Sequence, residues 1–390
     1  MNKDISPLKS RIAVTYIFFT LGMLSANWLI EIPAVQTKFH LTSGNLGLLL
    51  TGLPVGSVLT MAYIGKFISI YGSKRMTIIG ATLVHFFLAL LFLIPNIIVL
   101  WILLFCFGSS AAMLDVSMNS QGIEVEKITI NSIMSSLHAF FSIGGFVGAL
   151  IGGLFLTLHI GSESHLFIVA VLFYPFTLIA FNYLRVVDEK QILKESKRHK
   201  SIIELYQIKE IWILGLIAFI AILAEFVMND WSLIYVLTVT DVQANIAPIG
   251  FALFSLCMTV GRLVGDIVVK YTKTYRLIQY CAAIATVGIT ISVLANNFII
   301  IFFGYVLVGL GLSIIVPFIF RLAGNQEGTE IGSGLAGVAL FGYISTLAEP
   351  VFVGQVADFT SLRVSFALVG VLVFLIIFLA RNMNRETQAI

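Results

Sequence analysis

Charged side chains are scarce in this sequence. Only 11% of its 390 residues are Asp, Glu, Lys or Arg, whereas a water-soluble chain needs roughly a quarter. Hydrophobic residues make up 59%, and the mean hydropathy is +1.02. If about twelve spans of ~20 residues absorb this apolar surface, only short loops remain. The shortage of charge therefore excludes soluble domains of ordinary size and predicts a membrane protein.

Cysteines and catalytic motifs are few as well. The sequence has three cysteines, an odd number, and all of them lie in apolar runs: Cys106, Cys257 and Cys281. This excludes a secreted disulfide scaffold. The sequence has no metal-ligand spacing, nucleophile elbow, phosphate-binding loop or dinucleotide-binding turn in a suitable context. We therefore expect no enzyme, no cofactor, no bound metal and no ATP-driven transport.

Continuous apolar runs predict an all-α polytopic membrane protein with 12 transmembrane helices. The runs begin near residues 12, 45, 76, 97, 133, 165, 211, 248, 277, 298, 332 and 364. The first run carries Asn27 and Glu31 and has no small-residue cleavage site before the next one. We therefore expect it to be a retained span and not a signal peptide.

The distribution of basic residues predicts the orientation, because Lys and Arg gather in the cytosolic loops of membrane proteins. With the N-terminus inside, all 23 Lys and Arg residues lie on the cytosolic side except Lys38 and Arg363 in outer loops and Arg262 within a span. This predicts a multi-pass protein of the cell (inner) membrane with both termini cytosolic. The net charge of +3 then reflects topology and indicates no nucleic-acid partner.

The longest hydrophilic stretch divides the chain into two halves. We expect a six-helix bundle over residues 1–184, a cytosolic linker over 185–209 and a second six-helix bundle over 210–390. Two matches at the same offset of 203 positions support a duplication: Asn27-Trp28 with Asp230-Trp231, and Leu46-Gly47 with Ile249-Gly250. Two parallel repeats of this kind describe one large class of secondary transporters.

Loop motifs connect the chain to a known family. Gly65, Gly72, Lys74 and Arg75 follow the second run, and Gly261, Arg262 and Asp266 occupy the corresponding place after the eighth. This pattern resembles the GxxxDRxGRKR loop of the major facilitator superfamily, with Ser69 and Ile70 where that loop has its Asp and Arg. The resemblance implies two pseudo-symmetric six-helix bundles and a gating role for these glycine and charged residues, with the charged part of the gate mainly in the second half.

Three further segments resemble fucose-permease-type sugar/proton symporters and related bacterial permeases of that superfamily. They are Ala26 to Ile32 in the first span, Asp115 to Asn119 in the fourth, and the start of the fifth around His138. The resemblance implies proton-coupling and sugar-binding roles for Glu31 and Asp115.

Two other functions stay open. The first is a proton/drug antiporter, which would carry an Arg in the fourth span, where this sequence has Leu104 before Gly108. In the fifth span the antiporter motif is partly matched by Gly144, Gly148, Gly152 and Gly153. Close helix packing explains the same glycines. A non-transporting membrane sensor would need a soluble signalling segment, and the 25 residues from 185 to 209 are too few for one.

Six acidic residues are expected at membrane depth: Glu31, Asp115, Glu225, Asp230, Asp266 and Glu349. An ionised carboxylate in mid-span costs ~2.5 to 3.5 kcal/mol to insert, so each must face the bundle interior or water. We expect Glu31, Asp115 and Glu349 to couple the proton. Glu349 precedes Pro350, whose ring breaks a helical hydrogen bond, and a kink that only shapes the gate explains this acid equally well.

A second polar group lies in the seventh span and contains Glu225, Asn229, Asp230 and Trp231. Two acids, an amide and an indole can bind a hydroxyl-rich solute. The alternative for Trp231, and also for Trp28, is the aromatic belt at the outer membrane interface.

Other polar residues have structural alternatives too. Asp115 can instead pair with the cytosolic end of the fifth span, and His138 can be a hydrogen-bonded structural group. His85 in the third span has no partner that the sequence reveals.

Together these features predict a secondary active transporter that moves a small polar solute with protons by alternating access. A sugar or sugar acid is the expected class of solute. The expected partners are this solute, protons and the lipid bilayer, and the chain is expected to be monomeric. The expected solute-binding residues are Asn27, Asn119, His138, Glu225, Asn229, Asp230 and Trp231.

Overall fold

The computed structural model describes residues 5–93, 95–129, 133–186, 209–269, 271–324 and 333–383. Across these ranges the chain is helical and contains no strand, which confirms the all-α fold. By its contacts it divides into two compact units, residues 1–41 with 48–197 and residues 42–47 with 198–390. The predicted linker, residues 185–209, lies mostly outside the described ranges, and the predicted bundle boundaries stay predictions.

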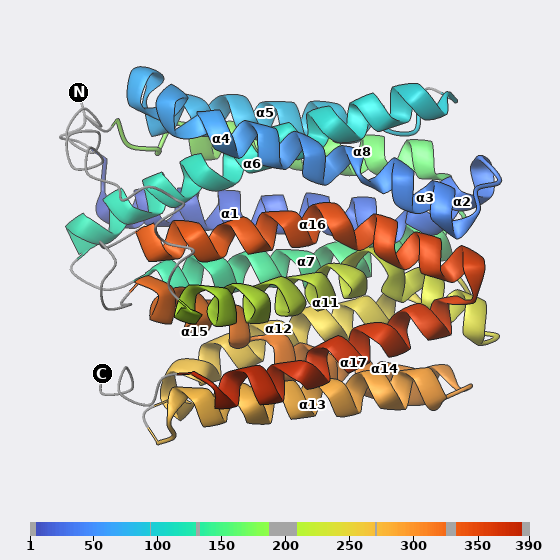
Figure 1. The fold of residues 1–390 in the computed structure, drawn as a ribbon. Coiled ribbons are helices and arrows are strands. Elements are labelled where there is room, and N and C mark those ends of the chain that lie inside the picture. Colours follow the sequence, from blue (N-terminus) through green and yellow to red (C-terminus); the bar gives the residue numbers. More distant parts are fainter. Residues whose placement is uncertain are drawn as a thin grey trace. The chain divides into compact units, whose positions relative to one another are not determined.

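The N-terminal half of the chain forms α1 to α8 (Figure 1). Their bounds are α1 Pro7–Ile30, α2 Ile32–Lys38, α3 Ser43–Leu50, α4 Gly52–Tyr71, α5 Ser73–Leu90, α6 Ile97–Thr129, α7 Met134–Thr157 and α8 Ser162–Phe181. Helices α1 and α2 follow each other within one apolar segment, and so do α3 and α4.

The C-terminal half forms α11 Lys209–Val239, α12 Pro248–Val268, α13 Thr274–Leu294, α14 Phe298–Leu312, α15 Ile315–Gly324, α16 Ser333–Phe359 and α17 Leu362–Arg381. Helices α14 and α15 share one apolar segment. Eleven segments of the described chain are long and apolar enough to cross a membrane. Helix α5, which has the basic pair Lys74-Arg75 in its first turn, occupies the place of the remaining predicted run.

Proline and glycine set the helix breaks. Helix α1 ends at Ile30, and α2 restarts with Pro33 in its first turn, where a missing N–H costs little. Glu31 is the residue at this junction. Gly72, between α4 and α5, has a φ of +83°, a backbone conformation that residues other than glycine rarely adopt. In α16, Pro350 lies within the helix and has no N–H to donate.

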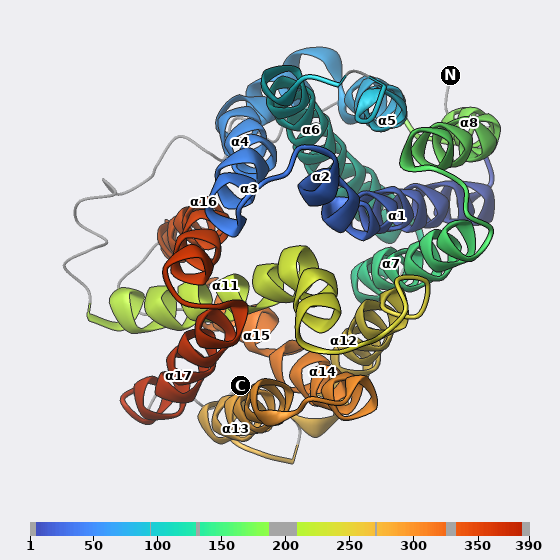
Figure 2. The same cartoon turned by 90° about the vertical axis from the view of Figure 1, so that its right-hand side faces the viewer.

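The glycines of α7 allow α1 and α7 to approach closely; Figure 2 shows these helices side by side. A Cβ on Gly22 of α1 would collide with the backbone of Phe141, and one on Gly144 of α7 with the backbone of Phe19. Gly148 lies against Met23 in the same interface. The glycine stripe of the fifth predicted span therefore serves helix packing.

Aromatic residues separate into a buried and an exposed set. Trp28 and Trp231 are both fully buried, so the alternative that places them in an aromatic belt at the membrane surface is wrong. By contrast, Phe176 of α8 and Phe374 of α17 are exposed on helix surfaces, and no charged residue lies within four positions of either one. In a multi-pass membrane protein such apolar surfaces face lipid.

Candidate functional site

Three buried polar side chains form a cluster in the first unit. We call it the His165 triad, and it consists of Asn27 of α1, Glu31 at the junction between α1 and α2, and His165 of α8. Nδ1 of His165 is 2.5 Å from Oε1 of Glu31, and Nε2 is 2.7 Å from Oδ1 of Asn27. All three residues are at most 1% exposed. The Phe155 ring of α7 stacks on the imidazole with 4.5 Å between ring centroids.

Sequence reasoning did not identify His165. It is one of six histidines and stands alone in the apolar sixth run, and 134 positions separate it from Glu31. The sequence offered one signal for His165: a polar residue within an apolar span needs a polar partner. The structure thus gives two predicted residues, Asn27 and Glu31, a shared partner that no local pattern indicates.

Asp115 and Asn119 lie one turn apart on α6, as predicted. The Asn119 amide donates to the backbone oxygen of Asp115 at 2.8 Å and to its carboxylate at 3.2 Å. Both side chains are half-buried. His138 near the start of α7 is exposed, and its ring meets Phe18 edge-on with 5.3 Å between centroids.

The polar group predicted in the seventh span lies on α11, and one of its members has a partner on the neighbouring helix α12. Glu225 of α11 pairs with Arg262 of α12, with 3.0 Å between Oε1 and Nη2, and each side chain is 25% exposed. Arg262, expected at the gate, and Glu225, expected at the solute, therefore contact each other. Asn229 and Asp230, farther along α11, are half-buried.

Glu349 lies where α16 packs against α11. Its carboxyl is fully buried and lies near Asp230 and Trp231 of α11. Neither carboxyl oxygen, nor the Trp231 indole nitrogen, has a partner at hydrogen-bonding geometry among the described residues. An ionised carboxylate without such partners is costly inside a membrane span, so this position favours a neutral carboxyl in this conformation.

The predicted gating loop of the first half lies between α4 and α5. Lys74 donates to the backbone oxygen of Leu184 at 2.9 Å, after the end of α8. Beside it, the buried amide of Gln121 of α6 donates to Ser73 at 2.8 Å and exchanges hydrogen bonds with the Arg185 backbone at 2.9 and 2.8 Å. Gln121, which sequence analysis did not select, ties the start of α5 to the end of α8.

The other predicted gating residues have different surroundings. A Cβ added at Gly65 or Gly72 would meet nothing within 4 Å, whereas one at Gly261 would collide with Ser313. Arg75 is exposed at the start of α5. The side chain of Asp266 lies outside the described part of the structure.

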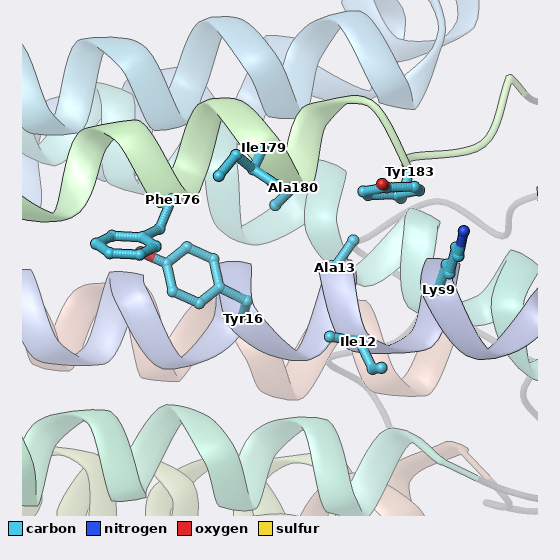
Figure 3. Close-up of a pocket in the computed structure, with 8 residues that line it drawn as sticks. All are labelled: Lys9, Ile12, Ala13, Tyr16, Phe176, Ile179, Ala180 and Tyr183. Atoms are coloured by element: carbon cyan, nitrogen blue, oxygen red, sulfur yellow. The ribbon is translucent and has the colours of Figure 1, made fainter.

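An open groove between α1 and α8 is a separate feature (Figure 3). It encloses about 320 Å³ and is lined mainly by apolar side chains. Lys9 lies at one end, 5.6 Å from the centre of the Tyr183 ring. None of the predicted proton- or solute-binding residues lines this groove.

His85 has partners after all. Its Nδ1 lies 2.8 Å from the Ala81 oxygen and its Nε2 3.4 Å from the Thr177 hydroxyl, and its ring packs on Tyr174. Within the described residues no group of three or more His, Cys, Asp or Glu side chains is arranged to hold a metal ion.

Comparisons with known proteins agree with this architecture. Residues 12–326 match the family model of the Major Facilitator Superfamily. An uncharacterised MFS-type transporter of Yersinia pestis is 30% identical over 379 residues, which cover 97% of each chain.

Solved structures with this fold include transporters of distant sequence. The nucleoside transporter NupG, in a mutant form, superposes with a TM-score of 0.81 at 10% identity, covering 96% of this chain and 100% of that one. The Escherichia coli fucose:proton symporter FucP, also a mutant form, gives 0.62 at 14% identity, covering 96% and 98%. At these identities the likeness shows the fold.

Proposed function

Because the chain belongs to the major facilitator superfamily, we propose that it is a secondary active transporter that couples a small polar solute to protons. The observation that carries this proposal is the Glu349 carboxyl, fully buried in a span without a hydrogen-bond partner among the described residues. Such a group is expensive in a membrane and serves proton relays in pumps and transporters. Glu31 and Asp115 are the corresponding carboxyls of the first unit.

A sugar or sugar acid is the solute class that we propose. Asp115, Asn119, Asn229 and Asp230 are half-buried polar side chains within spans, and such groups face water or a polar solute because lipid contact is unfavourable. Together they offer the amide and carboxyl groups that bind hydroxyls. The fold is shared with proteins named for transport of a nucleoside and of fucose with protons, which supports a hydroxyl-rich solute.

The first experiment identifies the solute. The purified protein is screened by thermal shift against sugars, sugar acids, amino acids and common drugs at two pH values. We expect stabilisation by a hydroxyl-rich compound, because a ligand that binds the folded state raises the unfolding temperature. Stabilisation by apolar drugs alone would instead favour a proton-driven efflux antiporter, which remains the second candidate.

The second experiment tests coupling with the compound that the screen selects. In proteoliposomes with an imposed pH gradient, Glu349→Gln is expected to abolish accumulation above equilibrium and to leave exchange of labelled for unlabelled solute active. The amide has the shape of the acid but cannot carry the coupled proton. The matched control is Glu163→Gln, at an exposed carboxyl that pairs with Lys38. Gradient-driven accumulation at the normal level in Glu349→Gln and also in Asp115→Asn would refute proton coupling by these acids.

A further inference from the structure

The hydrogen-bond pattern of the His165 triad fixes where its protons lie. The Asn27 amide nitrogen donates to the Met23 backbone oxygen at 2.8 Å, so the amide oxygen is the atom that faces His165. That oxygen can only accept, and Nε2 of His165 therefore carries a hydrogen. Asn27 thus selects which imidazole nitrogen remains for Glu31.

The second imidazole nitrogen shares one proton with Glu31. Nδ1 and Oε1 are 2.5 Å apart, a distance at which two lone pairs would repel each other. One proton lies between them, either on the imidazole beside a carboxylate or on the carboxyl beside a neutral imidazole. In both forms the triad has no net charge.

Removing this proton leaves a buried negative charge. Glu31 and His165 are at most 1% exposed, and the second oxygen of Glu31, Oε2, has no hydrogen-bond partner among the described residues. An uncompensated charge in such a place is strongly unfavourable. Deprotonation therefore favours a conformation in which Glu31 leaves His165.

The surrounding elements offer little compensation. Lys38 of α2 is engaged with Glu163 of α8 at 2.8 Å. Helix α7 presents the Phe155 ring, and His159 beyond its end is exposed. His85 of α5 is held by Ala81 and Thr177. The half of α6 from Ile97 to Leu114 carries no charged residue.

Glu31 lies where its release from His165 would free a junction between two helices. It occupies the junction between α1 and α2, whereas His165 lies in the first turn of α8. We propose that Glu31, His165 and Asn27 form a one-proton binding site that holds the α1–α2 junction to α8 when protonated and releases it when deprotonated. Use of this site in transport rests on the proposed function, whereas the shared proton does not.

The test measures the distance between α2 and α8 by double electron–electron resonance. Cys106, Cys257 and Cys281 are replaced by Ala, and spin labels are attached to Thr37→Cys of α2 and Phe167→Cys of α8, both exposed positions. In a pH series from about 5 to 9, the unsubstituted triad is expected to show one distance at low pH and a longer, broader distribution at high pH.

Two conservative variants remove the proton from the site in different ways. Glu31→Gln and His165→Gln are each expected to abolish the pH dependence of the distance, whereas His85→Gln, at a buried histidine outside the triad, is expected to retain it. Asn27→Leu is expected to shift the pH at which the distance changes, because Nε2 of His165 no longer has its hydrogen-bond acceptor. A pH-independent distance in the unsubstituted triad, or unchanged pH dependence in both Gln variants, overturns the proposal.

The outcome is separate from that of the transport assay. If the distance responds to pH and no compound is accumulated with a proton gradient, the one-proton site stands and the proposed coupling fails. If gradient-driven accumulation occurs and the distance does not respond, the coupling stands and this site fails.

Discussion

At the scale of single residues, the paired charges of α11 and α12 show how a carboxylate is accommodated in an apolar bundle. Glu225 and Arg262 lie 3.0 Å apart and each is 25% exposed. Their mutual attraction is screened less than that of a surface pair. Each residue alone would carry a charge that the span accommodates poorly.

We therefore expect Glu225→Gln and Arg262→Gln each to lower the free energy of unfolding. The double variant is expected to lower it by less than the sum of the two single effects. A coupling of about 0.5 to 3 kcal/mol is expected for residues in contact. A double-mutant cycle by chemical denaturation in detergent measures it. The control cycle uses Glu124 and Lys127 on α6, a pair whose lysine side chain is 60% exposed, and it should give at most about 0.5 kcal/mol. Equal couplings for the two pairs would count against a special role of the α11–α12 pair.

At the scale of helices, the α1–α7 interface depends on the absence of side chains. Gly22 of α1 faces the Phe141 backbone and Gly144 of α7 faces the Phe19 backbone, so each helix inserts a glycine against the other. The neighbouring atoms are backbone atoms, which cannot move aside as a flexible side chain can. The same two helices also carry Asn27, a member of the His165 triad, and Phe155, whose ring stacks on His165.

Gly22→Ala is expected to destabilise the protein by about 1 to 3 kcal/mol, because overpacking separates α1 from α7. Thermal unfolding in detergent measures the loss. Gly65→Ala in α4, where a Cβ meets nothing within 4 Å, is the matched control and should be neutral or slightly stabilising because alanine favours a helix. An unfolding temperature for Gly22→Ala equal to that of the control would contradict the packing account.

At the scale of the whole molecule, membrane orientation is predicted by the basic residues. All Lys and Arg except Lys38, Arg363 and Arg262 lie on the side expected to be cytosolic. The turn between α11 and α12 then faces outward, and the turn between α12 and α13 faces the cytosol.

Cysteine labelling of intact cells tests this orientation. In a chain without native cysteines, Gln243→Cys before α12 is expected to react with a membrane-impermeant maleimide in intact cells. Tyr271→Cys after α12, at a position 84% exposed, is expected to react only after the cells are permeabilised. The reverse pattern would establish the opposite topology, and labelling of both residues in intact cells would show that α12 does not span the membrane.

Local patterns were sufficient for most of the fold and for part of the candidate site. Apolar runs locate the helices, and the i, i+4 spacing placed Asp115 beside Asn119. The partners of Glu31 and Glu225 could not be predicted in this way. His165 is 134 positions from Glu31, and Arg262 is 37 positions from Glu225 on a different helix.

The sequence by itself determined that this protein is a bundle of apolar helices with few charges, because lipid demands internally hydrogen-bonded, apolar segments whatever their order in space. Only the tertiary structure decided how those few charges are matched. It paired Glu31 with His165 and Glu225 with Arg262, and it left Glu349 buried without a hydrogen bond among the described residues. Such pairings depend on which helix faces meet, and helix packing sets this through contacts between segments far apart in the chain.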